Sequence, residues 1–94
     1  MALVHLNQTI GTTVTKILTL PTGLQGPVAV QFQNLDAAAV FIGDATVTTS
    51  GATRGHSIAA AGTFQLWMNS GDTVYAISAA GTTAGALVVT YSGI

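Results

Sequence analysis

Residues 62–78, GTFQLWMNSGDTVYAIS, hold the clearest strand pattern in the chain. The first part alternates between two faces, with Phe64, Leu66 and Met68 on one and Gln65, Trp67 and Asn69 on the other. A period of two is typical of a β-strand that buries one face. Residues 69–72 (NSGD) all favour turns, and residues 73–78 again have strand-like composition. The stretch therefore predicts a β-hairpin over 62–78.

Trp67 does not fit the polar face on which the alternation places it. Its neighbours on that face are Gln65 and Asn69. Two interpretations remain open. Either the Trp67 face points outward and presents a contact residue, or it is the true core face and Phe64, Leu66 and Met68 form an exposed apolar row. In both cases the strand carries large apolar side chains on both faces, which favours association with another molecule.

Short strand-like runs recur through the rest of the chain, separated by turn residues. The expected strands are 12–20, 28–34, 38–43, 45–49 and 86–91, with shorter candidates at 3–6 and 56–58. Lys16 interrupts the first of these runs, either by extending its side chain along an edge or through a β-bulge. Thr, Val and Gly dominate, and no window has a helical apolar stripe. We expect an all-β fold, a compact antiparallel β-sandwich or jelly-roll-like barrel of about 7–9 short strands.

The length of 94 residues predicts one β-domain over 1–94. Residues 1–11 are expected to hold either a short strand or an extended N-terminal arm. The chain has no cysteine, so stability must come from the core or from association rather than from disulfides. No basic, apolar leader of the signal-peptide type is present near the N-terminus, and we expect synthesis in a cytoplasm.

Charge is scarce, since only 5% of residues are Asp, Glu, Lys or Arg, against about 25% in soluble proteins. Two basic residues are too few for the phosphate contacts that nucleic-acid binding requires. Electrostatic binding to a membrane surface is disfavoured for the same reason, and no apolar run approaches the length of a membrane span. A neutral surface loses little hydration energy on contact, so it suits packing against other proteins.

The polar residues do not form a recognisable catalytic or metal-binding motif. The chain lacks glutamate as well as cysteine, and His5 and His56 are far apart in sequence. Asp36, Asp44 and Asp72 lie in separate turns, where Asp most often bonds its own backbone. We expect no enzyme activity, no cofactor and no metal site.

Seven residues are candidates for an interface. Trp67, Gln65 and Asn69 share the outer face of the predicted strand, and Leu3 and His5 lie in the N-terminal segment. Arg54 and His56 lie in one loop, either as solvated residues or as contact residues. A sugar-binding alternative rests on Trp67 and Tyr75 sharing a face as a stacking platform, with Tyr91 as a further aromatic. These candidates are Trp67, Gln65, Asn69, Arg54, His56, Leu3 and His5.

Residues 28–48, VAVQFQNLDAAAVFIGDATVT, and 50–78, SGATRGHSIAAAGTFQLWMNSGDTVYAIS, resemble small virion proteins of tailed bacteriophages. The similarity is to capsid decoration (cement) proteins and related virion-associated β-sandwich modules. It covers more than half of the chain and lies in strand and turn positions, with no catalytic signature.

The resemblance implies a structural protein that decorates and stabilises a phage capsid by binding across junctions of the major capsid protein. It implies association of the chain with itself as a dimer or trimer and a location on the capsid surface. Two alternatives remain open: a carbohydrate-binding or host-adhesion module, and a tail or fibre component of the virion.

Overall fold

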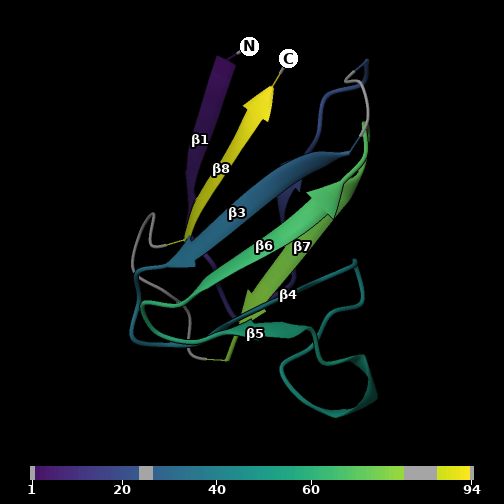
Figure 1. The fold of residues 1–94 in the computed structure, drawn as a ribbon. Coiled ribbons are helices and arrows are strands. Elements are labelled where there is room, and N and C mark those ends of the chain that lie inside the picture. Colours follow the sequence, from purple (N-terminus) through teal and green to yellow (C-terminus); the bar gives the residue numbers. More distant parts are fainter. Residues whose placement is uncertain (1, 24–26, 80–86, 94) are drawn as a thin grey trace.

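The fold consists of two four-stranded antiparallel sheets that pack face to face (Figure 1). The computed structural model describes residues 2–23, 27–79 and 87–93. Sheet A has the strand order β1-β8-β3-β6, and sheet B has the order β2-β7-β4-β5. The bounds are β1 Ala2–Gln8, β2 Thr15–Thr19, β3 Val28–Asn34, β4 Val40–Gly43, β5 His56–Ile58, β6 Thr63–Met68, β7 Thr73–Ser78 and β8 Leu87–Gly93, with one 3-10 turn, η1, at Gly51–Thr53.

The core lies between the sheets and confirms the predicted all-β sandwich. In β3 the buried residues alternate with more exposed ones, so Val30 and Phe32 point inward and Gln31 and Gln33 point outward. The same alternation buries Val40 and Ile42 in β4. Phe32 is fully buried at the centre, with Phe64 stacked on it at 6.2 Å between ring centroids. Period-two patterns in both sheets thus converge on one apolar layer.

The predicted hairpin over 62–78 is wrong in its pairing, although both strands exist. β6 pairs with β3 in sheet A, whereas β7 pairs with β2 and β4 in sheet B. The turn between them therefore crosses from one sheet to the other. Its backbone bonds to the end of β2: Gly71 N–H donates to Leu20 O at 3.1 Å, and Leu20 N–H donates to Asp72 O at 2.9 Å. A strand with one apolar face fits either sheet, since the two inner faces meet across the same core.

The Phe64 face of β6 is the inner one. Met68 is buried, Phe64 and Leu66 are half-buried against the core, and Gln65 and Trp67 are exposed. The interpretation with an outward Trp67 is therefore confirmed, and the interpretation with a Trp67 core is wrong.

Two further expectations are settled in and around sheet B. The register of the pairing between β2 and β7 shifts between Lys16 and Leu18. As a result Ile17 and Leu18 are both buried, while Lys16 is exposed. This is the predicted β-bulge. The expected strand at 45–49 is absent, because this segment turns at Asp44 and makes only an isolated bridge from Thr48 to Arg54.

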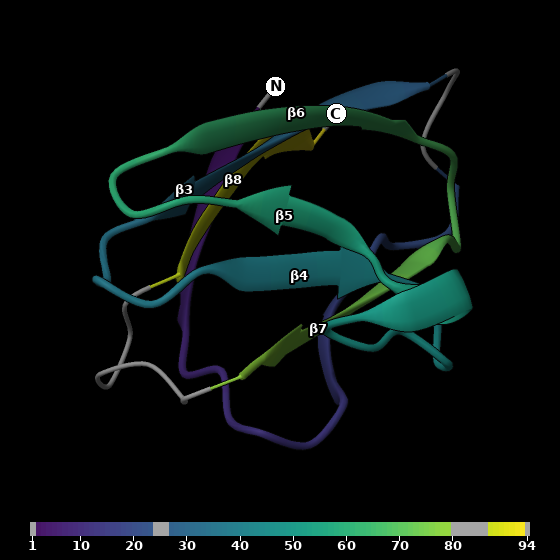
Figure 2. The same ribbon diagram turned by 90° about the horizontal axis from the view of Figure 1, so that it is seen from below.

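Of the two alternatives for the N-terminal segment, residues 2–8 form a strand and not an extended arm. β1 pairs antiparallel with β8 at seven positions, from Ala2 opposite Gly93 to Gln8 opposite Leu87. These residues form one edge of sheet A. Figure 2, seen from below, shows β6 of sheet A above β5 of sheet B, with a loop joining them at one end.

The three aspartates act in turns, as the sequence predicts. Asp36 Oδ2 accepts from Ala38 N–H at 2.9 Å. Asp44 Oδ1 accepts from Thr46 N–H at 2.8 Å, and Asp72 Oδ2 accepts from Asn69 N–H at 2.8 Å. Each carboxylate bonds backbone within three residues, which fixes the turn between successive strands.

Candidate interaction surface

The outer face of sheet A is a broad polar surface across four strands. Its residues alternate with core residues along each strand, and most of them are exposed. We define this surface by His5, Asn7, Ala29, Gln31, Gln33, Thr63, Gln65, Trp67, Val88 and Thr90.

Strand register aligns these side chains in rows. One row runs His5, Thr90, Gln31 and Gln65 from β1 to β6. Three interstrand spacings make that row roughly 14 Å long. Trp67 stands two residues beyond Gln65 and opposite Ala29, and 64% of its surface is exposed. The small Ala29 beside it leaves the indole ring uncovered on the sheet.

No charged side chain belongs to this surface, since the four strands of sheet A contain no Asp, Glu, Lys or Arg. The amide, hydroxyl and imidazole groups present give hydrogen-bond donors and acceptors without ions that must be desolvated. Trp67 adds a large apolar area of the kind enriched at protein interfaces. The surface can therefore dock against another neutral surface at a small desolvation cost.

The structure brings together only some of the predicted interface residues. Trp67, Gln65 and His5 lie on the outer face of sheet A. Leu3 lies in the same edge strand opposite Ser92, and its side chain is outside the described residues. Asn69 lies in the turn after β6, where its carbonyl oxygen accepts from Asp72 N–H at 3.0 Å.

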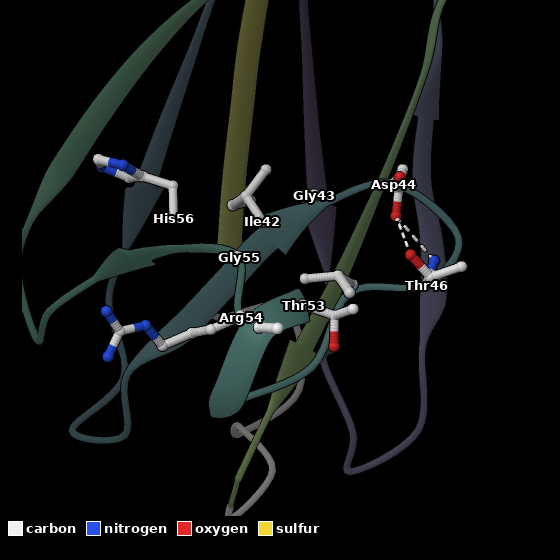
Figure 3. Close-up of a pocket in the computed structure, with 10 residues that line it drawn as sticks. Ile42, Gly43, Asp44, Thr46, Thr53, Arg54, Gly55 and His56 are labelled. Carbon is white, nitrogen blue, oxygen red and sulfur yellow. Dashed lines mark hydrogen bonds between the residues drawn. The ribbon is translucent and has the colours of Figure 1, made fainter.

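Arg54 and His56 belong to a different site, a polar hollow at one end of sheet B (Figure 3). The hollow has a volume of about 430 Å³. It is formed where the segment after β4 folds back along β5 and inserts Val47, which is 2% exposed. Val47 fits because Gly43 and Gly55 have no Cβ: a Cβ on Gly55 would overlap the carbonyl oxygen of Ile42 and Cγ2 of Val47. Because these two glycines have no side chains, the loop can pack directly against the strands.

The polar groups of the hollow do not form an acid–base pair. Asp44 Oδ1 accepts from both Thr46 N–H and Thr46 Oγ1–H, at 2.8 and 2.7 Å, and the side-chain bond leads in lowering the pKa of Asp44. Arg54 extends away from Asp44 in Figure 3. His56 stacks on Phe64 with 3.9 Å between ring centroids. Within the described ranges, no group of three or more His, Cys, Asp or Glu could hold a metal ion.

The predicted aromatic platform is wrong. Tyr75 belongs to β7 in sheet B, whereas Trp67 belongs to β6 in sheet A. Tyr91 is buried in the core. Trp67 therefore stands without either tyrosine on the outer face of sheet A.

The sequence interpretation missed the central part of the surface, formed by Gln31, Gln33 and Thr90. The alternation in 28–34 already placed both glutamines on the polar side. Their alignment with Gln65, however, depends on β3 lying between β8 and β6. Strand order of this kind has no local sequence signal.

Comparison of the chain with protein-family models, with curated proteins and with solved structures finds no match. No helix among the described residues is long and apolar enough to cross a membrane.

Proposed function

We propose that the protein is a non-catalytic structural component of a tailed-phage virion. In this function it decorates and stabilises the capsid by binding across junctions of the major capsid protein with the outer face of sheet A. The observation that carries the proposal is Trp67, 64% exposed within an uncharged four-stranded face. An aromatic anchor among neutral hydrogen-bonding groups is the composition expected of an interface centre.

Rigidity of the face also supports docking to a repetitive protein lattice. Gln31 and Gln33 stand on β3, which is bonded on both sides by β8 and β6 and is backed by fully buried Phe32. Because the backbone beneath these side chains is already ordered, binding a partner costs the ordering of the exposed side chains but not of the strands. Many copies on one particle would add modest individual contacts into strong overall attachment.

The test uses Trp67→Ala with Leu35→Ala as the matched control. Leu35 is also an exposed apolar residue, at 59%, but it lies in the turn after β3. Each protein is sedimented with empty expanded capsids of the phage whose genome encodes it. We expect Trp67→Ala to weaken binding about 30-fold, the equivalent of about 2 kcal/mol. Leu35→Ala should bind like the unchanged protein.

Absence of co-sedimentation with the unchanged protein would reject the capsid function, and so would equal binding by Trp67→Ala. A carbohydrate-binding function remains the second candidate, because Trp67 has Gln65 and Gln31 close by on the same face as hydrogen-bonding groups. A glycan array would support it only through signals that Trp67→Ala removes. Immunogold labelling of whole virions would separate a head location from a tail or fibre location.

A further inference from the structure

β6 is an edge strand whose outer backbone groups lack a strand partner. Among the described residues it pairs only with β3. Asn34 N–H donates to Gly62 O at 3.0 Å, and hydrogen-bonded positions in an antiparallel ladder recur every second residue. Phe64 and Leu66 therefore bond toward β3. The N–H and C=O groups of Thr63, Gln65 and Trp67 point to the free edge.

The free edge of β6 borders an apolar slot between the sheets. Phe64 and Leu66 line it from sheet A and Ile42 and Val74 line it from sheet B, and the volume is about 310 Å³. His56, which stacks on Phe64, and Asp44 also line it. Phe64 and Leu66 are only half-buried. An added strand beside β6 would place every second side chain over this slot. The site thus suits an extended segment with alternating apolar residues.

We propose that this segment is β6 of a second copy, paired antiparallel about a two-fold axis at Gln65. In this register Gln65 faces its own counterpart, and Phe64 faces Leu66 of the other copy. Thr63 faces Trp67 of the other copy on the outer side. The strand contains no charge, proline or bulge, so self-pairing brings no like charges together. A two-fold contact is also closed, which limits assembly to a dimer.

The other edges are less suited to self-pairing. β5 has three residues, and β2 has a bulge with exposed Lys16 beside it. Short length, charge and bulges are the usual protections of an edge strand. β1 is long and uncharged, but at its end Gln8 Nε2–H donates to Ile17 O at 2.8 Å. That bond joins sheet A to sheet B at one end of β1, so β1 is the competing edge, which the His5→Cys variant tests.

Self-pairing goes beyond the proposed function and does not rest on it. It would join two copies of sheet A into one eight-stranded sheet, with both outer faces on the same side. Trp67 of each copy would stand near the two-fold axis. Such a dimer would present two equivalent docking surfaces in a fixed orientation.

The first experiment measures the mass of the isolated protein by light scattering across a concentration series. The unchanged chain should reach twice the monomer mass of 9.4 kDa. Gln65→Lys places two lysines opposite each other and should weaken dimerisation at least tenfold. Gln31→Lys is the matched control, because it adds the same charge to the same face one strand inward, opposite Gln65 in the ladder. It should leave the dimer intact.

The second experiment uses the absence of native cysteine. Hydrogen-bonded antiparallel pairs have Cα atoms about 5.5 Å apart, within the range of about 4.4–6.8 Å that suits disulfides. Gln65→Cys should form an intermolecular disulfide in mild oxidant. Gln31→Cys, inside the sheet, and His5→Cys, at the centre of β1, should not.

A monomeric unchanged chain overturns the inference, as does a dimer insensitive to Gln65→Lys. Cross-linking of His5→Cys in place of Gln65→Cys assigns the contact to β1 and also overturns it. Binding to capsids is tested separately by co-sedimentation. A monomeric protein that still binds capsids through Trp67 rejects the dimer alone.

Discussion

The two sheets share one core but differ in what covers their outer faces. Sheet A presents an uncovered row of amide and hydroxyl groups with exposed Trp67. Sheet B is covered at one end by its own loop, because Val47 packs over Gly43 and Gly55. The loop covers only that end of sheet B, and Phe41, Tyr75 and Ile77 lie half-buried on the rest of its outer side. The outer face of sheet A is more polar and is uncharged, so it is the face that can be desolvated at small cost.

The charged residues are also distributed unequally between the two sheets. Lys16 lies in sheet B, and Asp44 and Arg54 flank its hollow. Asp36 and Asp72 lie in turns that cross between the sheets. The chain thus keeps its few ions away from the strands of sheet A. In a protein with so few charged residues, this placement indicates which side can be desolvated at the lowest cost.

The largest effect on the free energy of unfolding is expected from a substitution of Asn34, which joins the two sheets by hydrogen bonds. This fully buried side chain at the end of β3 donates to Ala38 O at 2.8 Å and to Ile58 O at 3.0 Å. Asn34→Asp puts a carboxylate against both carbonyl oxygens. We expect the free energy of unfolding to fall by about 3 kcal/mol or more.

Urea denaturation at neutral pH measures this loss. Gln33→Glu, which adds a carboxylate on the exposed outer face next to Asn34 in sequence, is the matched control and should change stability by less than about 0.5 kcal/mol. Equal effects of the two substitutions would show that the Asn34 bonds do not hold the sheets together.

A smaller effect is expected from removing the cover of sheet B with Gly55→Ala. The new methyl group would overlap Ile42 O and Val47 Cγ2, so the loop must move off the strands. We expect about 2 kcal/mol of destabilisation. Gly11→Ala is the control, since its nearest contact would be Thr13 N at 4.0 Å. Amide exchange should accelerate at Val47 while β3 stays protected, and uniform protection in Gly55→Ala would contradict the packing described.

The smallest effect concerns the pKa of Asp44 in the same loop. Its hydrogen bonds to Thr46 hold the pKa below the ordinary value of 3.8. Because the folded-state pKa is the lower one, the bonds contribute stability above about pH 3.8, and this contribution is lost as pH falls through the folded-state pKa. An NMR titration of the Asp44 carboxyl should have its midpoint below 3.8.

Thr46→Ala removes the side-chain donor and should raise this midpoint. A midpoint that does not respond to Thr46→Ala would mean that the Thr46 hydroxyl does not stabilise the carboxylate. Trp67→Ala lies on the other sheet and serves as the control, with no change expected in the Asp44 titration.

The sequence by itself determined the parts of this protein that depend on near neighbours. Alternation in 28–34, 40–43 and 87–91 fixed which residues of each strand face the core. The acidic turn residues bonded their own backbone, as their chemistry favours. The position of Trp67 on the polar side of its strand was also readable from the period of two. All these features arise within a few residues along the chain.

Only the tertiary structure decided which strands became partners. A turn-rich segment between β6 and β7 served equally for a hairpin or for a crossing between sheets, and its bonds to Leu20 selected the crossing. That choice separated Trp67 from Tyr75 and placed Trp67 in the same sheet as Gln31 and Thr90. Pairing between distant strands depends on how the whole apolar layer packs. For that reason the surface that we propose as functional has no contiguous sequence motif.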